Sequence, residues 1–507
     1  MMFRLPLQAL LFAFASSQWS AASPVTQSRS AAAQEPDPSF AVTVKLNGVG
    51  FVNKGQVAFG LIPSDFKEST GDTLGGIGSA IALKPGSFRK LENGSFIGTI
   101  VTQPDRGFNI DGTINYQARQ HAIDFVLTPY YDDANLSFED AQKTLQLTYK
   151  NTLLYTERSN FPTSGLNPQA IRPAQLGFRL LSFADPPLAI ASSSLPHLSL
   201  DSEGLALHTD GSFWMSDEYG PYIFHFDSQG HLLQAIQPPD AILPKIGGEL
   251  NFTAEVIPDT GRSPNQGFEG LTLDDTGNTL YVLLQSATVQ DGGDDDTTSR
   301  YTRLLAYDVS DPLILTPPLI GEWVVPLPQS KKNKTRAASE VHFVHKNVFL
   351  VLARDGNGHG DDDTDSSYKQ ADLIDITGAT NIAGSKFDQA KNPIAKKGKL
   401  DKSITPATYA SFVSFIDDTQ LARFGLHNGD PNDQTLIDAK WESLALAPVG
   451  DPANPDDFFL FTAADNDFIS THGVALGQPF DAGLDNDNQF MVFRVTLPST
   501  KSKSKHV

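Results

Sequence analysis

The chain has 507 residues, of which 40% are hydrophobic and 19% are charged, as in a folded globular protein. Its 38 basic and 59 acidic residues give a formal net charge of −21, which argues against nucleic acid as a partner because a phosphate backbone needs a basic surface. Cysteine is absent, and this excludes disulfides, zinc–thiolate sites, iron–sulfur clusters and thiol nucleophiles.

The N-terminal segment has the pattern of an export signal. A basic residue precedes the apolar stretch 5–15, and small residues at 20–22 offer a cleavage site. We therefore expect a signal peptide over residues 1–22 and a flexible lead-in, rich in Ser, Ala, Pro and Gln, over residues 23–39. Because no second long apolar run follows, we expect no membrane anchor. The short basic tail 499–507 is expected to be disordered.

Four N-x-S/T sequons are present, and together with an export signal they are typical of a glycosylated secreted protein. The acceptor residues are Asn93, Asn135, Asn251 and Asn333. We therefore predict a secreted, extracellular glycoprotein, and we expect it to act as a monomer.

Residues 40–498 consist mainly of short apolar or alternating runs separated by Gly, Pro, Asn and Asp. Residues 212–216, 279–284 and 347–352 are examples, because each run has the length of a strand and is rich in β-branched and aromatic residues. Stretches with helical periodicity are scarce, and a helix is expected only near residues 137–145. This pattern predicts one all-β domain.

A weak internal repeat runs through this domain. Its unit is an acidic residue that opens a strand, then a turn, then a second strand that ends in polar residues; the units begin at Glu203, Glu269, Glu340 and Glu442. Residues 75–107 resemble a degenerate earlier copy. The spacings of 66, 71 and 102 residues exceed a minimal blade of ~40–50 residues, as expected when loops are inserted. We therefore predict an irregular β-propeller of about six or seven blades with inserted loops.

The repeated glutamates are the first candidate functional residues. The strand nearest the axis begins each blade of a propeller, so equivalent residues of successive blades converge on the central channel. Carboxylates that close together need protons or a cation, and oxygen ligands favour Ca²⁺ or Mg²⁺. We predict a divalent cation, Ca²⁺ in the first instance, bound by Glu203, Glu269, Glu340, Glu442 and Asp467. The alternative is that each glutamate only caps a turn or pairs with an arginine.

Polar residues at the ends of the inner strands form the second candidate set. Carboxylates at these positions could act as a general base, and arginines could hold an anionic oxygen with two hydrogen bonds. The predicted catalytic residues are Asp217, Glu218, Asp355, Asp465, Arg106 and Arg354. The predicted substrate-binding residues are Tyr219, Arg303 and Asn466. The alternative is that these strand ends form ordinary turns.

Several well-known catalytic motifs are absent. The sequence has no G-x-S-x-G nucleophile elbow, no H-E-x-x-H motif and no phosphate-binding loop, and its 11 histidines are scattered. Two loops rich in Asp and Gly, at residues 291–296 and 355–363, lack the EF-hand register and are typical of solvated acidic loops. These observations favour attack by water, assisted by a metal.

Several segments resemble the hallmarks of a known family. Residues 201–207 and 214–221 are similar to the D-x-E-G-L-A and W-x-S-D-E-Y-G-P signature of the phytase-like family, which is described as having the esterase-like activity of phytase. Residues 265–273 and 440–445 resemble two further hallmarks. The resemblance extends over residues 74–497 and implies a secreted β-propeller hydrolase that acts on phosphoric or similar esters.

Together, these observations predict a secreted hydrolase of phosphoric esters, in which a metal-activated water attacks a small-molecule ester in the propeller channel. Two alternatives stay open. One is a lactonase or carboxylic esterase on the same propeller, and the other is a propeller that binds its partner without catalysis.

Overall fold

The computed structural model describes residues 35–107, 112–157, 160–175 and 185–498. The expected signal peptide, most of the lead-in and the basic tail therefore lie outside the described residues. Among the residues that are described, no helix has the length and apolar character needed to cross a bilayer.

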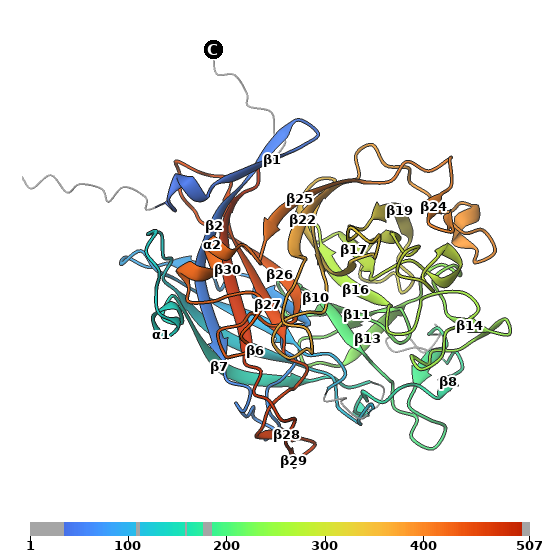
Figure 1. Ribbon diagram of the computed structural model, residues 1–507. Helices are drawn as coiled ribbons and strands as arrows, with labels where there is room; N and C mark the ends of the chain where they lie inside the picture. Colours follow the sequence, from blue (N-terminus) through green and yellow to red (C-terminus); the bar gives the residue numbers. More distant parts are fainter. Residues whose placement is uncertain (1–34, 108–111, 158–159, 176–184, 499–507) are drawn as a thin grey trace, which may run out of the picture. The chain divides into compact units, whose positions relative to one another are not determined.

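Five antiparallel sheets form the blades of a β-propeller (Figure 1). From the axis outward, their strands are as follows: blade I, β3 (Ala80–Leu83), β5 (Phe96–Gln103), β6 (Arg119–Leu127) and β7 (Leu145–Leu154), with β4 (Arg89–Lys90) paired to β5; blade II, β10 (Ser202–Leu207), β11 (Phe213–Asp217), β12 (Ile223–Phe226) and β13 (Leu232–Ile236); blade III, β16 (Phe268–Leu273), β17 (Thr279–Leu284), β18 (Tyr301–Asp308) and β19 (Leu319–Pro326); blade IV, β20 (Ala337–His345), β21 (Val348–Arg354), β22 (Lys369–Asp375) and β25 (Thr408–Ser414); blade V, β26 (Lys440–Pro448), β27 (Asp457–Asp465), β30 (Asn488–Thr496), β2 (Val49–Ile62) and β1 (Val42–Leu46).

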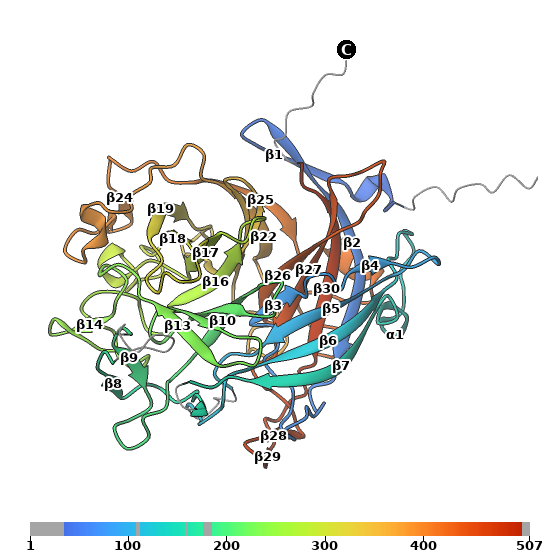
Figure 2. The ribbon, with the colours of Figure 1, turned by 180° about the vertical axis from the view of Figure 1, so that it is seen from behind.

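The ring closes by combining the two ends of the described chain in blade V. The N-terminal strand β2 pairs antiparallel with the C-terminal strand β30, and the two lie side by side in Figures 1 and 2. On the axis, β3 contacts β10 and β26, β16 contacts β10 and β20, and β20 contacts β26. Every inner strand therefore has an inner strand of another blade on each side, so the five strands surround one axis.

The structure confirms the propeller but corrects the number of blades from six or seven to five. Four blades begin at the four repeats, and the degenerate copy in residues 75–107 supplies β3 and β5 of blade I. The remaining length lies in excursions between strands, where it forms short hairpins instead of further blades. These hairpins are β8 (Ala170–Arg172) with β9 (Leu188–Ile190), β14 (Lys245–Ile246) with β15 (Glu249–Leu250), β23 (Ala395–Lys396) with β24 (Lys399–Leu400), and β28 (Gly473–Ala475) with β29 (Gln478–Phe480).

The local predictions hold with small changes at the ends of the elements. The three predicted strands are β11, β17 and β21, each second in its blade. The predicted helix at 137–145 is the single turn α1 (Phe138–Ala141), which begins where Ser137 accepts a hydrogen bond from the Asp140 amide. It ends early because the chain enters β7 at Leu145. A second short helix, α2 (Asp418–Arg423), precedes blade V.

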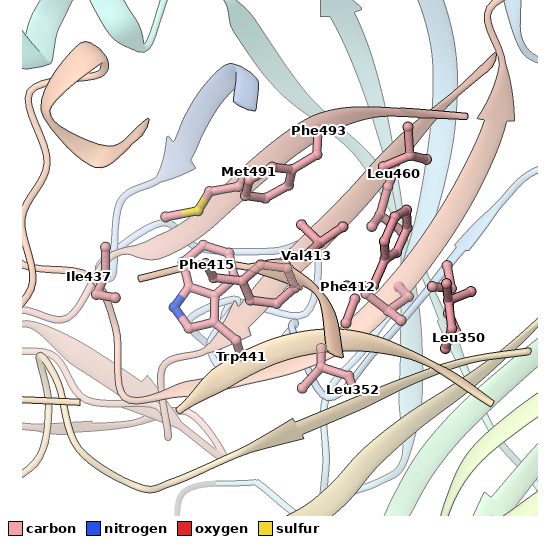
Figure 3. Packing of buried hydrophobic residues seen from close by; sticks show 14 of the residues in the cluster. Leu350, Leu352, Phe412, Val413, Phe415, Ile437, Trp441, Leu460, Met491 and Phe493 are labelled. Carbon is pink, nitrogen blue, oxygen red and sulfur yellow. The ribbon is translucent and has the colours of Figure 1, made fainter. Parts of the chain in front are cut away.

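Apolar side chains fill the spaces between adjacent blades. Figure 3 shows one such cluster, in which Trp441 of β26 lies among side chains of blades IV and V, and the rings of Phe415 and Phe493 stack at 5.4 Å. Trp441 is fully buried, and truncation of so large a core side chain typically costs ~3–5 kcal/mol. This packing fixes the inner strands, and hence the polar residues that they carry toward the axis.

Candidate functional site

Strand pairing brings the predicted residues to one end of the axis. Because each inner strand is antiparallel to the second strand of its blade, the start of one lies beside the end of the other. Ser202 is paired with Asp217 in blade II, and Lys440 with Asp465 in blade V. The glutamates that open the inner strands and the polar residues that close the second strands therefore meet at the same end.

The inner strands are irregular where the glutamates lie. The pairing register shifts at Glu203, Glu269 and Glu442, and just before Glu340, so each glutamate is at a β-bulge, a feature common next to active sites. The glycine after two of them also permits close contact between blades. A Cβ on Gly270 would lie 2.1 Å from the Val341 amide nitrogen. The Glu-Gly pair of the repeat thus combines a side chain aimed at the axis with tight packing of neighbouring inner strands.

Eight carboxyl groups and three cationic side chains meet at this end of the axis, and we call them the axial cluster. They interact electrostatically with one another, and seven of the carboxyl residues are less than a tenth exposed, Asp467 being the exception. The members are Asp105, Asp201, Glu203, Glu218, Glu269, Glu442, Asp465, Asp467, Arg106, Arg354 and Lys440. If every group were ionised, the cluster would carry an excess of negative charge.

Within the axial cluster, two sets of three carboxylates have the spacing of metal ligands. In the Glu218 trio (Asp201, Glu203 and Glu218), one oxygen of each residue lies within 4.8 Å of the others. The Asp465 trio (Asp105, Asp465 and Asp467) has the same property. Both trios combine residues of different blades or loops, so neither can form without the closed ring.

The three cations are distributed unequally between the trios. Arg106 donates to Asp201 Oδ2 at 2.9 Å and to Asn265 Oδ1 at 2.5 Å. Lys440 Nζ donates to Asp465 Oδ2 at 2.8 Å and to Asp467 Oδ1 at 2.7 Å. Arg354 pairs with Glu442, outside both trios. The Asp465 trio thus has an ammonium group at two of its members, whereas the Glu218 trio has a guanidinium at one.

Burial and mutual repulsion raise the pKa values of the carboxyl groups at the axis. Burial and the charge of Asp201 raise the pKa of Glu218 to about 8. Burial, followed by the charges of Glu269 and Glu218, raises the pKa of Glu203 well above its usual value. Without a cation the cluster therefore retains protons near neutral pH, and Glu218 has a pKa suited to proton transfer there.

Glu340 is the one repeated glutamate that does not join the axial cluster. Its Oε1 accepts hydrogen bonds from the amides of Val341 at 2.8 Å and of Leu271, in the next blade, at 3.2 Å. Its carboxylate therefore links the inner strands β16 and β20. For this residue the structure favours the alternative reading of a glutamate bonded to the backbone.

Several predicted catalytic and substrate-binding residues are engaged in holding the strand ends. Asp217 accepts from the amides of Asp201 and Gly220 at 2.7 and 2.9 Å. The remaining three residues of this kind are Asp355, which accepts from Ser366 Oγ at 2.6 Å, Asn466, which accepts from the Gly76 amide at 2.6 Å, and Tyr219, whose hydroxyl donates to the Gly165 carbonyl at 2.9 Å. Of the expected set, Glu218, Asp465, Arg106 and Arg354 are left with polar groups in the axial cluster.

Arg303 lies in a different place from the one expected of a substrate-binding residue. It is on β18, the third strand of blade III, and it is fully buried. Its guanidinium donates to Asp291 Oδ2 at 2.8 Å and to Glu322 Oε1 at 2.6 Å. All its nitrogens are engaged in this triad or with the Phe387 carbonyl, so its contacts are structural.

Three members of the axial cluster were missed in the sequence prediction, namely Asp105, Asp201 and Lys440. Two signals could have indicated them: Asp201 opens the Asp-x-Glu-Gly segment, and Lys440 precedes Glu442 by two positions, as Asp201 precedes Glu203. Asp105 precedes Arg106 in the degenerate copy, where no glutamate marks the repeat.

The sequons differ in exposure. Asn93, Asn135 and Asn333 are exposed, as an attached glycan requires, whereas Asn251 is half-buried. The Asn251 side-chain oxygen accepts from the Thr253 amide at 3.1 Å. The first three sites are therefore the better candidates for modification.

Comparisons with known proteins point to one family. The family model "Phytase-like: Esterase-like activity of phytase" matches residues 75–418. A protein of Arthroderma benhamiae (strain ATCC MYA-4681 / CBS 112371), named "Uncharacterized secreted protein", is 38% identical over 456 residues, which are 83% of this chain and 88% of that protein. The family match ends before blade V, whereas the fold needs that blade to close the ring.

Similar solved structures include a putative 6-phosphogluconolactonase from Bacteroides uniformis, with 9% identity, a TM-score of 0.28, and coverage of 81% of this chain and 85% of the other. A catalytically inactive virginiamycin B lyase from Staphylococcus aureus has 7% identity, a TM-score of 0.26, and coverage of 87% and 100%. At these TM-scores we base no argument on either structure.

Proposed function

This chain belongs to the phytase-like family, and we propose that it is a secreted, monomeric hydrolase of phosphoric esters whose reaction takes place at the axial cluster. The family and the propeller fold support a hydrolase-type function. The proposal of secretion rests on the N-terminal pattern and on the name of the Arthroderma relative. The single observation that carries the site is the convergence of buried carboxylates from successive blades on one end of the axis.

A divalent cation, Ca²⁺ in the first instance, belongs to this proposal because the residues fit it. The Glu218 trio supplies only carboxylate oxygens, which hard cations prefer. Glu218 Oε1 has no hydrogen-bond partner among the residues that the structure describes, although the residue is 2% exposed. A bound cation supplies charge neutralisation for a phosphate oxygen and lowers the pKa of a coordinated water.

The chain's own residues have three roles in this proposal. The Glu218 carboxylate, with its pKa near neutrality, accepts a proton from the attacking water. Arg106 and Arg354 lie at the edge of the cluster, with side chains 18% and 15% exposed, and can donate hydrogen bonds to an incoming anionic oxygen. The buried walls limit access of bulk water, so charges at the site interact more strongly than in solution.

A neutral lactone or carboxylic ester is the second candidate substrate. The observation that favours it is the charge of the axial cluster, in which eight carboxyl groups face three cations. A phosphate ester would be repelled unless a cation is bound, whereas a neutral ester would not. A substrate panel therefore decides between the two classes.

The test is a panel of phosphate esters, lactones and carboxylic esters, assayed with Ca²⁺ and with a chelator. We expect phosphate release that depends on Ca²⁺ and falls by about 10²–10⁴-fold in Glu218→Gln. Glu92→Gln, at an exposed residue of a turn in blade I, is the matched control and should retain activity. Full activity of Glu218→Gln would refute the proposed role of this carboxylate, and lactone opening without phosphate release would assign the second class.

A further inference from the structure

We infer that the axial cluster binds one divalent cation, at the Glu218 trio, and that the ammonium group of Lys440 occupies the place of a second cation at the Asp465 trio. The inference rests on the proposed function for the location of the cation, and it adds the number of ions and the residue that limits it. Two independent observations carry it: the contacts of Lys440, and the lack of such a partner at Glu218.

Lys440 is held among the carboxylates of the Asp465 trio by strand pairing. It is the first residue of β26 and is paired with Asp465, the last residue of β27. Its Nζ lies 2.8 Å from Asp465, 2.7 Å from Asp467 and 3.6 Å from Glu442. An ammonium group has three N–H donors and a compact positive charge, so it satisfies several carboxylates at once, as a metal ion does.

The Glu218 trio has the same arrangement of oxygens without such a central cation. In the described part of the chain, its ion pair is that of Arg106 with Asp201, at 2.9 Å. Glu218 Oε1 has no hydrogen-bond partner there, although the side chain is buried. A buried carboxylate without a partner is strongly unfavourable, so this trio needs a positive ligand that the polypeptide does not provide.

The spacing of the trio suits a hard cation of the size of Ca²⁺. Calcium binds oxygen at 2.3–2.6 Å, so two oxygens on opposite sides of the ion lie ~5 Å apart. The oxygens of the Glu218 trio lie within 4.8 Å of one another, so all three can contact one ion. Neither trio contains histidine, so a hard oxygen-binding ion is favoured over a transition metal.

The experiment counts bound ions in the full-length protein. After removal of metals by a chelator, Ca²⁺ is titrated calorimetrically, and Tb³⁺ luminescence gives a second count. We expect one ion per chain in the wild type, at least 100-fold weaker binding in Glu218→Gln, and two ions in Lys440→Met. Lys440→Arg keeps the positive charge and is the matched control, with one ion expected.

Each outcome separates this inference from the proposed function. Two ions in the wild type, or a single ion in Lys440→Met, would overturn the inference. One ion with no hydrolysis of any ester would leave the inference standing and remove the proposed function, whereas hydrolysis by a chain that binds no ion would do the reverse. If Lys440→Met unfolds without metal, its melting temperature is followed against Ca²⁺: recovery of folding supports the inference, and no recovery contradicts it.

Discussion

Replacement of Arg303 by methionine removes the positive charge from a triad that is completely buried in blade III. The guanidinium contacts Asp291 and Glu322 at 2.8 and 2.6 Å, and the side chains of all three residues are 0% exposed. Methionine has a similar length but cannot donate hydrogen bonds, so two carboxylates are left together without a cation. The carboxylates then either remain charged at high cost or take up protons.

Removal of one partner from a buried ion pair typically costs ~3–5 kcal/mol. With an unfolding entropy of ~2.1 cal/mol/K per residue, a chain of 507 residues loses about 1 kcal/mol of stability per degree near its melting temperature. We therefore expect Arg303→Met to lower the melting temperature by roughly 3–5 °C. The double variant with Glu322→Gln should recover part of this loss, because one of the stranded charges is removed.

The assay combines thermal melting with ester turnover per folded molecule. Because the Arg303 guanidinium is engaged away from the axial cluster, we expect turnover by the folded fraction to stay at the wild-type value. Arg300→Met, at an exposed position three residues earlier, is the control and should change the stability by less than about 0.5 kcal/mol. A variant that melts like the wild type but has lost turnover would refute this reasoning and restore a substrate-binding role for Arg303.

Three further predictions concern stability. Burial, followed by the charge of Arg119, lowers the pKa of His121 to about 3, so the unfolded chain binds the extra proton below pH 6.5; stability should fall by ~1.4 kcal/mol per pH unit from 6.5 to 4, and urea melts of His121→Asn should lack this component, an equal slope in both proteins being the contrary result. Glu340→Ala, which removes an acceptor of two backbone amides, should cost ~2–3 kcal/mol in the same melts, and Glu340→Gln clearly less; equal losses would argue against the amide bonds. Gly270→Ala should destabilise by ~1–3 kcal/mol because its Cβ would overlap backbone, whereas Gly378→Ala, which has open space, should be near neutral; matching melting curves would contradict the close packing of the inner strands.

The sequence by itself determined the class of fold and the position of the acidic residues within each blade. Alternation and turn residues are local signals, so the strands at 279–284 and 347–352 could be assigned without knowledge of their neighbours. The repeat that begins at Glu203 and Glu269 indicated that carboxylates recur at equivalent positions. In a ring of blades, equivalent positions necessarily face the same axis.

The number of blades and the partners of each carboxylate were decided only by the tertiary structure. The length between repeats does not reveal whether it forms a blade or a loop, because that depends on packing against other sheets. Glu340 and Glu442 occupy matching positions in the sequence, yet one binds backbone amides and the other binds Arg354. Lys440 meets Asp465 through strand pairing within its blade, and it reaches the charge of Asp105 because closure of the ring brings blade I beside blade V.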